Sequence, residues 1–139
     1  MTRALQLTGP VIPETKLHKQ ITDAMRLEIC REGHVSPKGV CWFSIDMANY
    51  GGIPGTRVAR GICAGVPDVI VLFRGDAHWI EIKTDAGVLS DDQREVCASL
   101  LLSGCRYAVA RDADEVLACI DAWQIPRKKL IRLATRVAA

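Results

Sequence analysis

The chain has 139 residues, which is enough for one domain with a sizeable core and too few for two ordinary domains. Hydrophobic residues make up 49% and charged residues 24% of it, which excludes an intrinsically disordered or collagen-like chain. The net charge of +2 is too small to argue for a nucleic-acid partner by itself. We therefore expect a folded, soluble domain, whose function must be inferred from particular residues.

Other features of the composition concern the compartment and metal binding. No apolar run approaches the roughly 18–20 residues that cross a bilayer, and residues 1–9 lack an apolar block followed by a cleavage site. The six cysteines include no pair with the two-residue spacing of zinc ribbons and redox pairs, and most have apolar neighbours. His34 and His78 lie in or beside predicted turns, where we expect them to be solvated. We therefore predict no membrane segment, no zinc site and reduced core thiols in a cytoplasmic protein.

The first predicted element is an amphipathic helix. Apolar residues recur every four positions from Leu17 to Ile29, and Pro13 precedes them as a typical helix start. We expect this helix to end near Glu32. Two glycines and a proline at 33–39 then predict a loop.

Three strands are predicted in the middle of the chain. Residues 40–45 form the first, because they are β-branched and aromatic. The second, 68–73, is an unbroken apolar run behind one acid, and the third, 79–83, follows across turn residues 74–76, as in a hairpin. The glycine-rich stretch 46–66 is unusually long for a connection in a small domain, and such loops are often functional.

The last third of the chain alternates helices with one strand. A helix is predicted between Ser90, which has a glutamine three positions on as in a capping box, and Gly104, which ends it. Residues 106–110 form a buried strand, residues 112–123 a capped helix, and Pro126 can begin a fourth, basic helix. The order α-β-β-β-α-β-α, with a right-handed crossover from the third strand to the fourth, defines an α/β fold with a mixed sheet flanked by helices.

Three charged residues are predicted to meet at one edge of this sheet. Glu81 and Lys83 project from the same face of the third strand, because side chains two apart in a strand point the same way. Asp68 lies at the end of the antiparallel neighbour that faces Lys83. Two carboxylates at a strand end suit Mg²⁺ or Mn²⁺, and a lysine beside them can orient water and stabilise phosphate charge. The alternative is a surface acid beside an ordinary cross-strand ion pair.

The residues around these charges resemble one family of nucleases. Gly-Val-Pro-Asp at 65–68, Glu-Ile-Lys-Thr at 81–84 and Leu-Ser-Asp-Asp-Gln at 89–93 are similar in order and spacing to the VRR-NUC family within the PD-(D/E)XK nuclease superfamily. The resemblance covers residues 14–123. It implies a restriction-endonuclease-like α-β-β-β-α-β core and metal-dependent hydrolysis of DNA phosphodiester bonds.

The resemblance also assigns roles to the residues at the strand ends. It implies that Asp68, Glu81 and the backbone carbonyl of Ile82 bind Mg²⁺ or Mn²⁺. It further implies that Lys83 handles the attacking water and contacts DNA. These residues would form the catalytic centre.

Two helical residues are weaker candidates for the same centre. Gln93 would face the site from its helix, although its spacing from Ser90 equally predicts a helix cap. Glu14 matches an acid that the family carries on its first helix, but the helix dipole alone also favours an acid in a first turn. Four residues on, where family members often have glutamine, this chain has His18.

Basic residues outside this centre are candidates for DNA contacts. Arg57 and Arg60 lie in the long loop before Asp68 and are predicted to grip phosphates, although surface arginines often have no such role. Residues 124–139 include five basic residues and no acidic one, which predicts either a phosphate-facing tail or a solvated helix face. We divide the chain into a leader at 1–12, a VRR-NUC-like nuclease domain at 13–123 and a basic C-terminal helix or tail at 124–139.

The predicted function is that of a metal-dependent, structure-specific DNA endonuclease. Resemblance to stand-alone VRR-NUC proteins implies branched DNA such as Holliday junctions as substrate, and a bacterial or phage-infected cell as location. Resolution of a four-way junction needs two symmetric cuts, so we expect a homodimer. Two alternatives remain: a nuclease of flaps or ends, and a DNA-binding or protein-interaction module that keeps the fold without useful catalysis. Intact Asp68, Glu81 and Lys83 argue against the second alternative.

Overall fold

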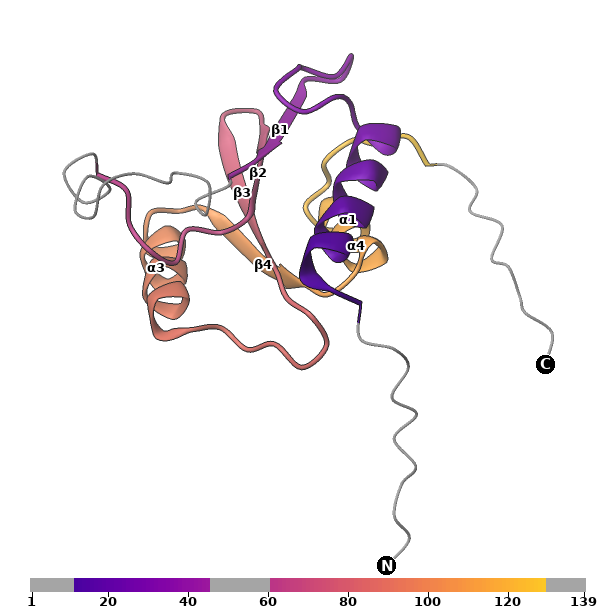
Figure 1. Cartoon of the computed structure of the whole chain (residues 1–139). Coiled ribbons are helices and arrows are strands. Elements are labelled where there is room, and N and C mark those ends of the chain that lie inside the picture. The colour runs from indigo at the N-terminus through magenta and orange to yellow at the C-terminus, as the bar shows by residue number, and fades with distance from the viewer. Residues whose placement is uncertain (1–11, 46–60, 130–139) are drawn as a thin grey trace, which may run out of the picture.

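A computed structural model describes residues 12–45 and 61–129 as a four-stranded mixed sheet with helices on both faces (Figure 1). The elements are α1 (Glu14–Glu28), β1 (Val40–Ser44), β2 (Val69–Phe73), β3 (Asp76–Ile82), α3 (Asp91–Leu102), β4 (Arg106–Ala110) and α4 (Ala113–Ala122). Their order and the flanked mixed sheet confirm the predicted α/β, restriction-endonuclease-like fold class. In the described part of the chain, no helix has the length and apolarity that crossing a membrane requires.

The strands lie across the sheet in chain order, β1-β2-β3-β4. β2 pairs antiparallel with both β1 and β3, whereas β3 and β4 are parallel and are connected through α3. In the β2–β3 hairpin Val69 pairs with Ile80, so the chain just before β2 lies beside the end of β3. This register brings Asp68 next to Ile82, where the predicted site lies.

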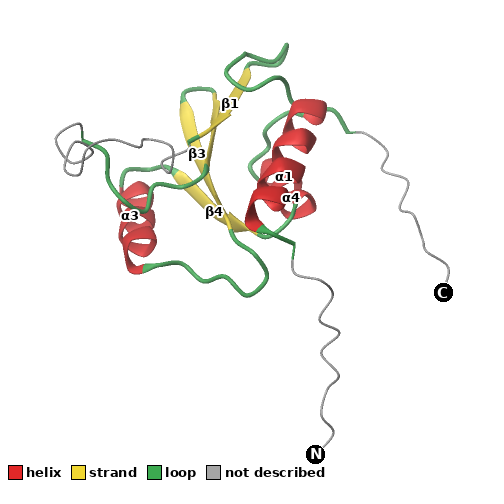
Figure 2. Ribbon diagram, in the orientation of Figure 1, coloured by secondary structure: helices red, strands yellow, loops and turns green. Residues whose placement is uncertain are grey.

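The hydrophobic core lies between the sheet and the α1–α4 layer. Figure 2 shows α1 and α4 together on one side of the sheet and α3 on the other. None of the residues of α3 is fully buried, so the sheet face that α3 covers is packed less tightly than the face beneath α1 and α4. The core is formed by Leu17, Ile21, Met25, Ile29, Val40, Trp42, Val69, Val71, Ile80, Ile82, Ala110, Val116, Ile120 and Ile125.

The boundaries of two elements differ from the prediction. Phe73 pairs with Asp76, so Arg74 and Gly75 alone form the hairpin turn, with φ of 52° and 79°. Successive positive φ values are typical of a two-residue type I′ turn, and β3 therefore begins earlier than predicted. α1 ends at Glu28 instead of continuing to about residue 32, because the chain after it turns back to β1, where the N–H of Gly33 donates to the Trp42 carbonyl at 2.8 Å.

One prediction about side chains is wrong, and another is confirmed in part. His78 is only 3% exposed, its Nδ1 lies 3.0 Å from the Val71 carbonyl oxygen, and its ring contacts Trp123. The earlier start of β3 explains this burial, since His78 is a strand residue on the core face and not a turn residue. The six cysteines are free thiols, as predicted, but none is fully buried and Cys63 is exposed; Cys30 packs against the core while partly buried.

The segment 125–129, which follows α4, forms no helix, although Pro126 was a possible start of a basic one and a tail was the alternative. The Arg127 guanidinium lies 2.8 Å from Oε1 of Glu28 and 2.8 Å from Oδ2 of Asp121. These ion pairs tie the segment to α1 and α4, which explains why it does not form a separate helix. The rest of the predicted tail, 130–139, lies outside the described residues.

Candidate active site

The site lies where the β2–β3 hairpin places acidic residues at one end of the sheet. Oδ2 of Asp68 accepts a hydrogen bond from the N–H of Ile82 at 2.8 Å. On the other side of β3, the N–H of Lys83 donates to the Ala110 carbonyl at 3.0 Å. These contacts hold the backbone of Ile82 and Lys83 in addition to the regular strand pairing. The structure therefore brings together the three charged residues predicted to meet.

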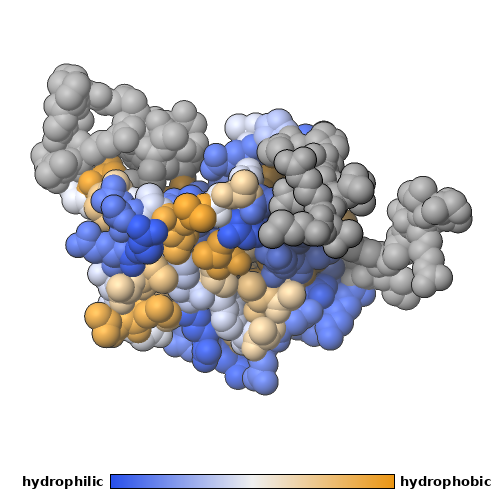
Figure 3. Space-filling model, turned by 90° about the horizontal axis from the view of Figure 1, so that it is seen from below, coloured by the Kyte–Doolittle hydropathy of each residue, from blue (hydrophilic) through white to orange (hydrophobic). Residues whose placement is uncertain are grey.

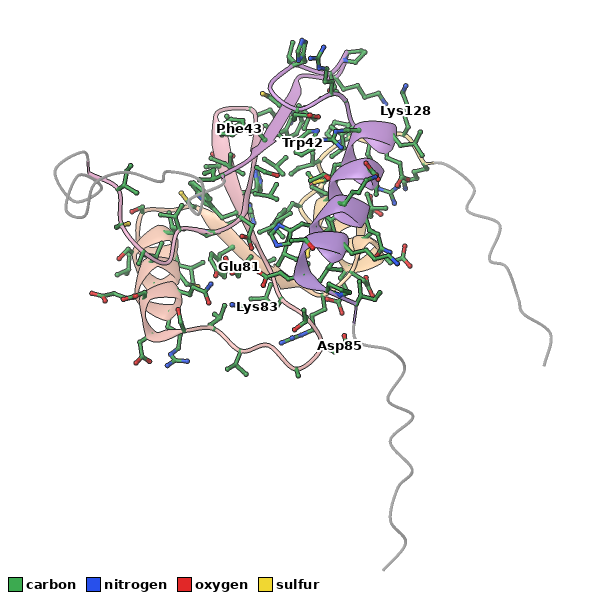
Figure 4. The ribbon with its side chains drawn as sticks, in the orientation of Figure 1. Trp42, Phe43, Glu81, Lys83, Asp85 and Lys128 are labelled. Atoms are coloured by element: carbon green, nitrogen blue, oxygen red, sulfur yellow. The ribbon has the colours of Figure 1, made fainter. Side chains whose placement is uncertain are left out.

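Glu81 is the most enclosed charged side chain of this group, at 3% exposure. Its Oε1 lies 3.6 Å from Nζ of Lys83 and accepts a hydrogen bond from Nε2 of Gln93 at 2.7 Å. Among the described residues, its Oε2 has no hydrogen-bond partner. Figure 4 shows Glu81 and Lys83 between α1 and α3. One carboxylate oxygen is thus held by the protein, and the other is enclosed without a hydrogen-bond partner in the described part of the chain.

Burial weakens both carboxyl groups as acids, and the charge of Asp68 weakens Glu81 further. Burial and then the charge of Asp68 raise the pKa of Glu81 to about 7, against the opposing effect of Lys83. Burial also raises the pKa of Asp68, while its hydrogen bond from Ile82 and the charge of His18 lower it. A cation between the two carboxylates would relieve their repulsion, so the electrostatics favour metal binding.

Gln93 has two structural roles. Its Oε1 accepts a hydrogen bond from the N–H of Ser90 at 2.9 Å, and its own N–H donates to Oγ of Ser90 at 3.2 Å. These bonds complete the capping box of α3. The amide nitrogen of the same side chain donates to Glu81. The sequence left helix capping and a site contact as alternatives, and the structure contains both.

A close backbone approach connects the loop before Asp68 to the start of α3. Gly65 has a φ of +90°, and a Cβ atom there would lie 2.4 Å from the carbonyl oxygen of Asp92 and 2.8 Å from the nitrogen of Gln93. No side chain fits in this space, and the positive φ also favours glycine. The glycine of the Gly-Val-Pro-Asp motif therefore allows the loop before Asp68 to lie against the start of α3.

The first turn of α1 approaches the site from another direction. The charge of Glu14 raises the pKa of Asp68, and the charge of His18 lowers it. The side chain of Glu14 is 71% exposed, and its Oε1 lies 3.8 Å from Nε2 of His18. That nitrogen is buried and has no hydrogen-bond partner among the described residues. The structure thus places Glu14 near the site and adds His18 to its surroundings.

Tyr107 also lies in this region, although no pattern in the sequence predicted it. Tyr107 pairs with Trp79 in β4, and its buried hydroxyl has no hydrogen-bond partner among the described residues. Burial, followed by the charge of Glu81, raises the pKa of this hydroxyl. A tyrosine in an apolar strand gives no sequence signal for such a position, which depends on the pairing of β3 with β4.

The groups present fit a hard divalent cation. Asp68 and Glu81 provide carboxylate oxygens, and Oε2 of Glu81 is buried without a partner among the described residues. Within 12–45 and 61–129, no three His, Cys, Asp or Glu side chains are grouped so that they could hold a metal by themselves. A cation here would therefore also need water or backbone oxygens, which is usual for Mg²⁺.

Some predicted functional residues cannot be placed. Arg57 and Arg60 lie outside the described residues, as do residues 1–11 of the predicted leader. Their proposed roles remain predictions from the sequence.

Comparison with known families agrees with this site. Residues 55–114 match the family model of the VRR-NUC domain, and the match includes Asp68, Glu81, Lys83 and Gln93. This match agrees with the resemblance to VRR-NUC nucleases that the motifs predicted, and it supports a nuclease. A search of curated proteins found no match, and neither did a search of solved structures.

Proposed function

We propose that this protein is a metal-dependent, structure-specific endonuclease that hydrolyses phosphodiester bonds in branched DNA such as Holliday junctions. The observation that carries the proposal is the state of Glu81, which is 3% exposed, has a pKa raised to about 7 and keeps one oxygen without a partner among the described residues. Such a carboxylate beside Asp68 destabilises the metal-free fold. In a nuclease domain, binding a cation explains why the pair is there.

Each residue at the strand ends would have a separate role in the reaction. Asp68, Glu81 and the carbonyl of Ile82 would hold Mg²⁺ or Mn²⁺. When bound, that cation would make water a stronger nucleophile and neutralise charge on the phosphate. Lys83, whose side chain is 19% exposed, would orient the attacking water and stabilise the charge that develops on the phosphate. Gln93 would keep the Glu81 carboxylate in one orientation through its 2.7 Å hydrogen bond.

The proposed substrate also bears on assembly and DNA contacts. Because a four-way junction needs two symmetric cuts and the chain has one such centre, we propose a homodimer. Arg57 and Arg60 are the proposed phosphate contacts in the loop before Asp68. Arg127 is not among them, because its guanidinium is engaged by Glu28 and Asp121.

The test is cleavage of four-way-junction, flap and linear DNA of matched sequence with Mg²⁺, Mn²⁺ or a chelator. Symmetric, cation-dependent cuts in the junction would support the proposal. Cleavage of flaps or ends alone would show the simpler nuclease, and binding without cleavage would show a DNA-binding module. Asp68→Asn should abolish cleavage, whereas Asp76→Asn, which changes an exposed acid at the hairpin end of β3, should retain it.

A further inference from the structure

The loop at 84–89 connects β3 to α3, and Arg111 holds it in place. Nη1 of Arg111 lies 2.5 Å from the Thr84 carbonyl oxygen, 2.9 Å from that of Gly87 and 3.3 Å from that of Asp85. The half-buried guanidinium reaches the loop from the position directly after β4. A single cationic side chain therefore contacts three carbonyl groups of a loop that has no regular secondary structure.

This loop packs against the aliphatic part of Lys83. The N–H of Gly87 donates to the Thr84 carbonyl at 2.9 Å and closes a turn. A Cβ atom on Gly87 would lie 3.3 Å from Cδ and 3.4 Å from Cβ of Lys83, so the loop backbone lies directly beside the lysine stem. The backbone of Lys83 is itself fixed by Ala110. β4 thus holds the backbone of Lys83, and the loop lies against the side chain whose Nζ is 3.6 Å from Oε1 of Glu81.

We propose that Arg111 is a positioning residue for Lys83, which acts by holding loop 84–89 against the lysine side chain. A free lysine side chain has many rotamers, and restricting them keeps the ammonium where the reaction needs it. The catalytic consequence rests on the proposed nuclease function, whereas the contacts between Arg111, the loop and Lys83 do not.

The alternative role for Arg111 is a direct contact with a DNA phosphate. Figure 3 shows the end of the molecule that carries the loop, where hydrophilic and hydrophobic side chains are mixed. Val88 on this loop is 78% exposed, so DNA could reach its outer surface. An arginine that only binds phosphate contributes to DNA affinity, whereas a positioning residue contributes to the chemical step. Loss of a phosphate contact would therefore raise KM, whereas loss of a positioning residue would lower kcat.

The experiment compares Arg111→Lys and Gly87→Ala with the unchanged protein. Arg111→Lys keeps the charge but has a shorter side chain and lacks Nη1, the atom that contacts all three carbonyl groups. We expect it to speed amide hydrogen exchange at Gly87 by about ten-fold or more, because the turn opens more often. It should also lower kcat on DNA by about ten-fold with KM little changed. Gly87→Ala should lower kcat without any change in charge, because the added methyl group displaces the Lys83 stem.

Arg106→Met is the matched control, since Arg106 is an exposed arginine at the other end of β4 and should change neither measurement. Unchanged exchange at Gly87 in Arg111→Lys would overturn the proposal, whether or not the protein cleaves DNA. Unchanged kcat in both variants, or a raised KM alone, would also overturn it and leave the nuclease function intact. If Arg111→Lys does not fold, Gly87→Ala decides the kinetic question. An unchanged protein that cleaves no DNA would refute the nuclease function and with it the catalytic role of Arg111.

Discussion

Replacing Glu81 with glutamine removes the charge that burial and Asp68 disfavour most strongly in the folded protein. The ordinary pKa of this carboxyl is 4.5, and its pKa in the folded protein is about 7. Between these values the folded state binds more protons than the unfolded state, so the stability of the unchanged protein falls as the pH rises through this range. At about 1.4 kcal/mol per pKa unit, the whole effect is about 3 kcal/mol.

The variant lacks this titration but keeps an oxygen that can accept the hydrogen bond from Gln93. In the absence of divalent cations, we expect the stability of Glu81→Gln relative to the unchanged protein to increase by about 2–3 kcal/mol between pH 5 and pH 8. Cleavage should be lost at both pH values. At pH 8, Mg²⁺ or Mn²⁺ should stabilise the unchanged protein and not the variant.

Urea unfolding followed by circular dichroism, with chelator present, measures this difference. Comparison of the two proteins at each pH cancels the titration of the groups that do not interact with Glu81, and Asp85→Asn controls for the loss of an exposed charge. A stability difference that is the same at pH 5 and pH 8 would refute the reasoning, because Glu81 would then titrate alike in the folded and unfolded states.

Three further variants test other parts of the structure. Lys83→Ala should lower the cleavage rate by several orders of magnitude with circular dichroism unchanged. It removes the positive charge that lies beside Glu81 and that would stabilise the phosphate of the DNA substrate. Gly65→Ala should lower both the melting temperature and activity, because its Cβ would overlap the Asp92 carbonyl. Arg127→Met should reduce the free energy of unfolding by about 3 kcal/mol, measured in urea, since Glu28 is 1% exposed, while cleavage per folded molecule stays unchanged.

Each of these variants has an outcome that would contradict its premise. Near-normal cleavage by folded Lys83→Ala would remove lysine from the mechanism. A fully stable and active Gly65→Ala would mean that the loop and α3 do not approach as described. Loss of DNA binding without loss of stability in Arg127→Met would show that this arginine contacts phosphate, as part of a phosphate-facing tail.

The sequence predicted the fold because its local signals agree with the tertiary structure. The apolar period from Leu17 to Ile29 became the buried side of α1, and the capping residues Ser90 and Asp112 lie where their helices begin. Boundaries were less well predicted where tertiary contacts override local preference. The segment 125–129 is the clearest case, since an ion pair between residues 99 positions apart, Arg127 and Glu28, ties it to α1.

The candidate site was predicted in part. Alternation along β3 and the hairpin register bring Asp68, Glu81 and Lys83 together, and both can be inferred from sequence. The position of Tyr107 could not be inferred, because it depends on the register of a parallel pair whose strands are separated by a helix. The contact of Arg111 with the 84–89 loop also has no local signal, since its partners are backbone carbonyl groups.

The two faces of the sheet have different roles, which explains how a small domain tolerates a site with two buried carboxyl groups. The face beneath α1 and α4 contains the continuous apolar core, including Ile80 and Ile82 on either side of Glu81 in β3. Those alternate residues stabilise the strand, while Glu81 points to the face that α3 covers less tightly. The cost of burying the Glu81 carboxylate beside Asp68, about 3 kcal/mol, therefore falls on a strand that the opposite face already anchors. Because strand residues alternate between faces, the same β3 can stabilise the fold with one set of side chains and present charged groups with the other.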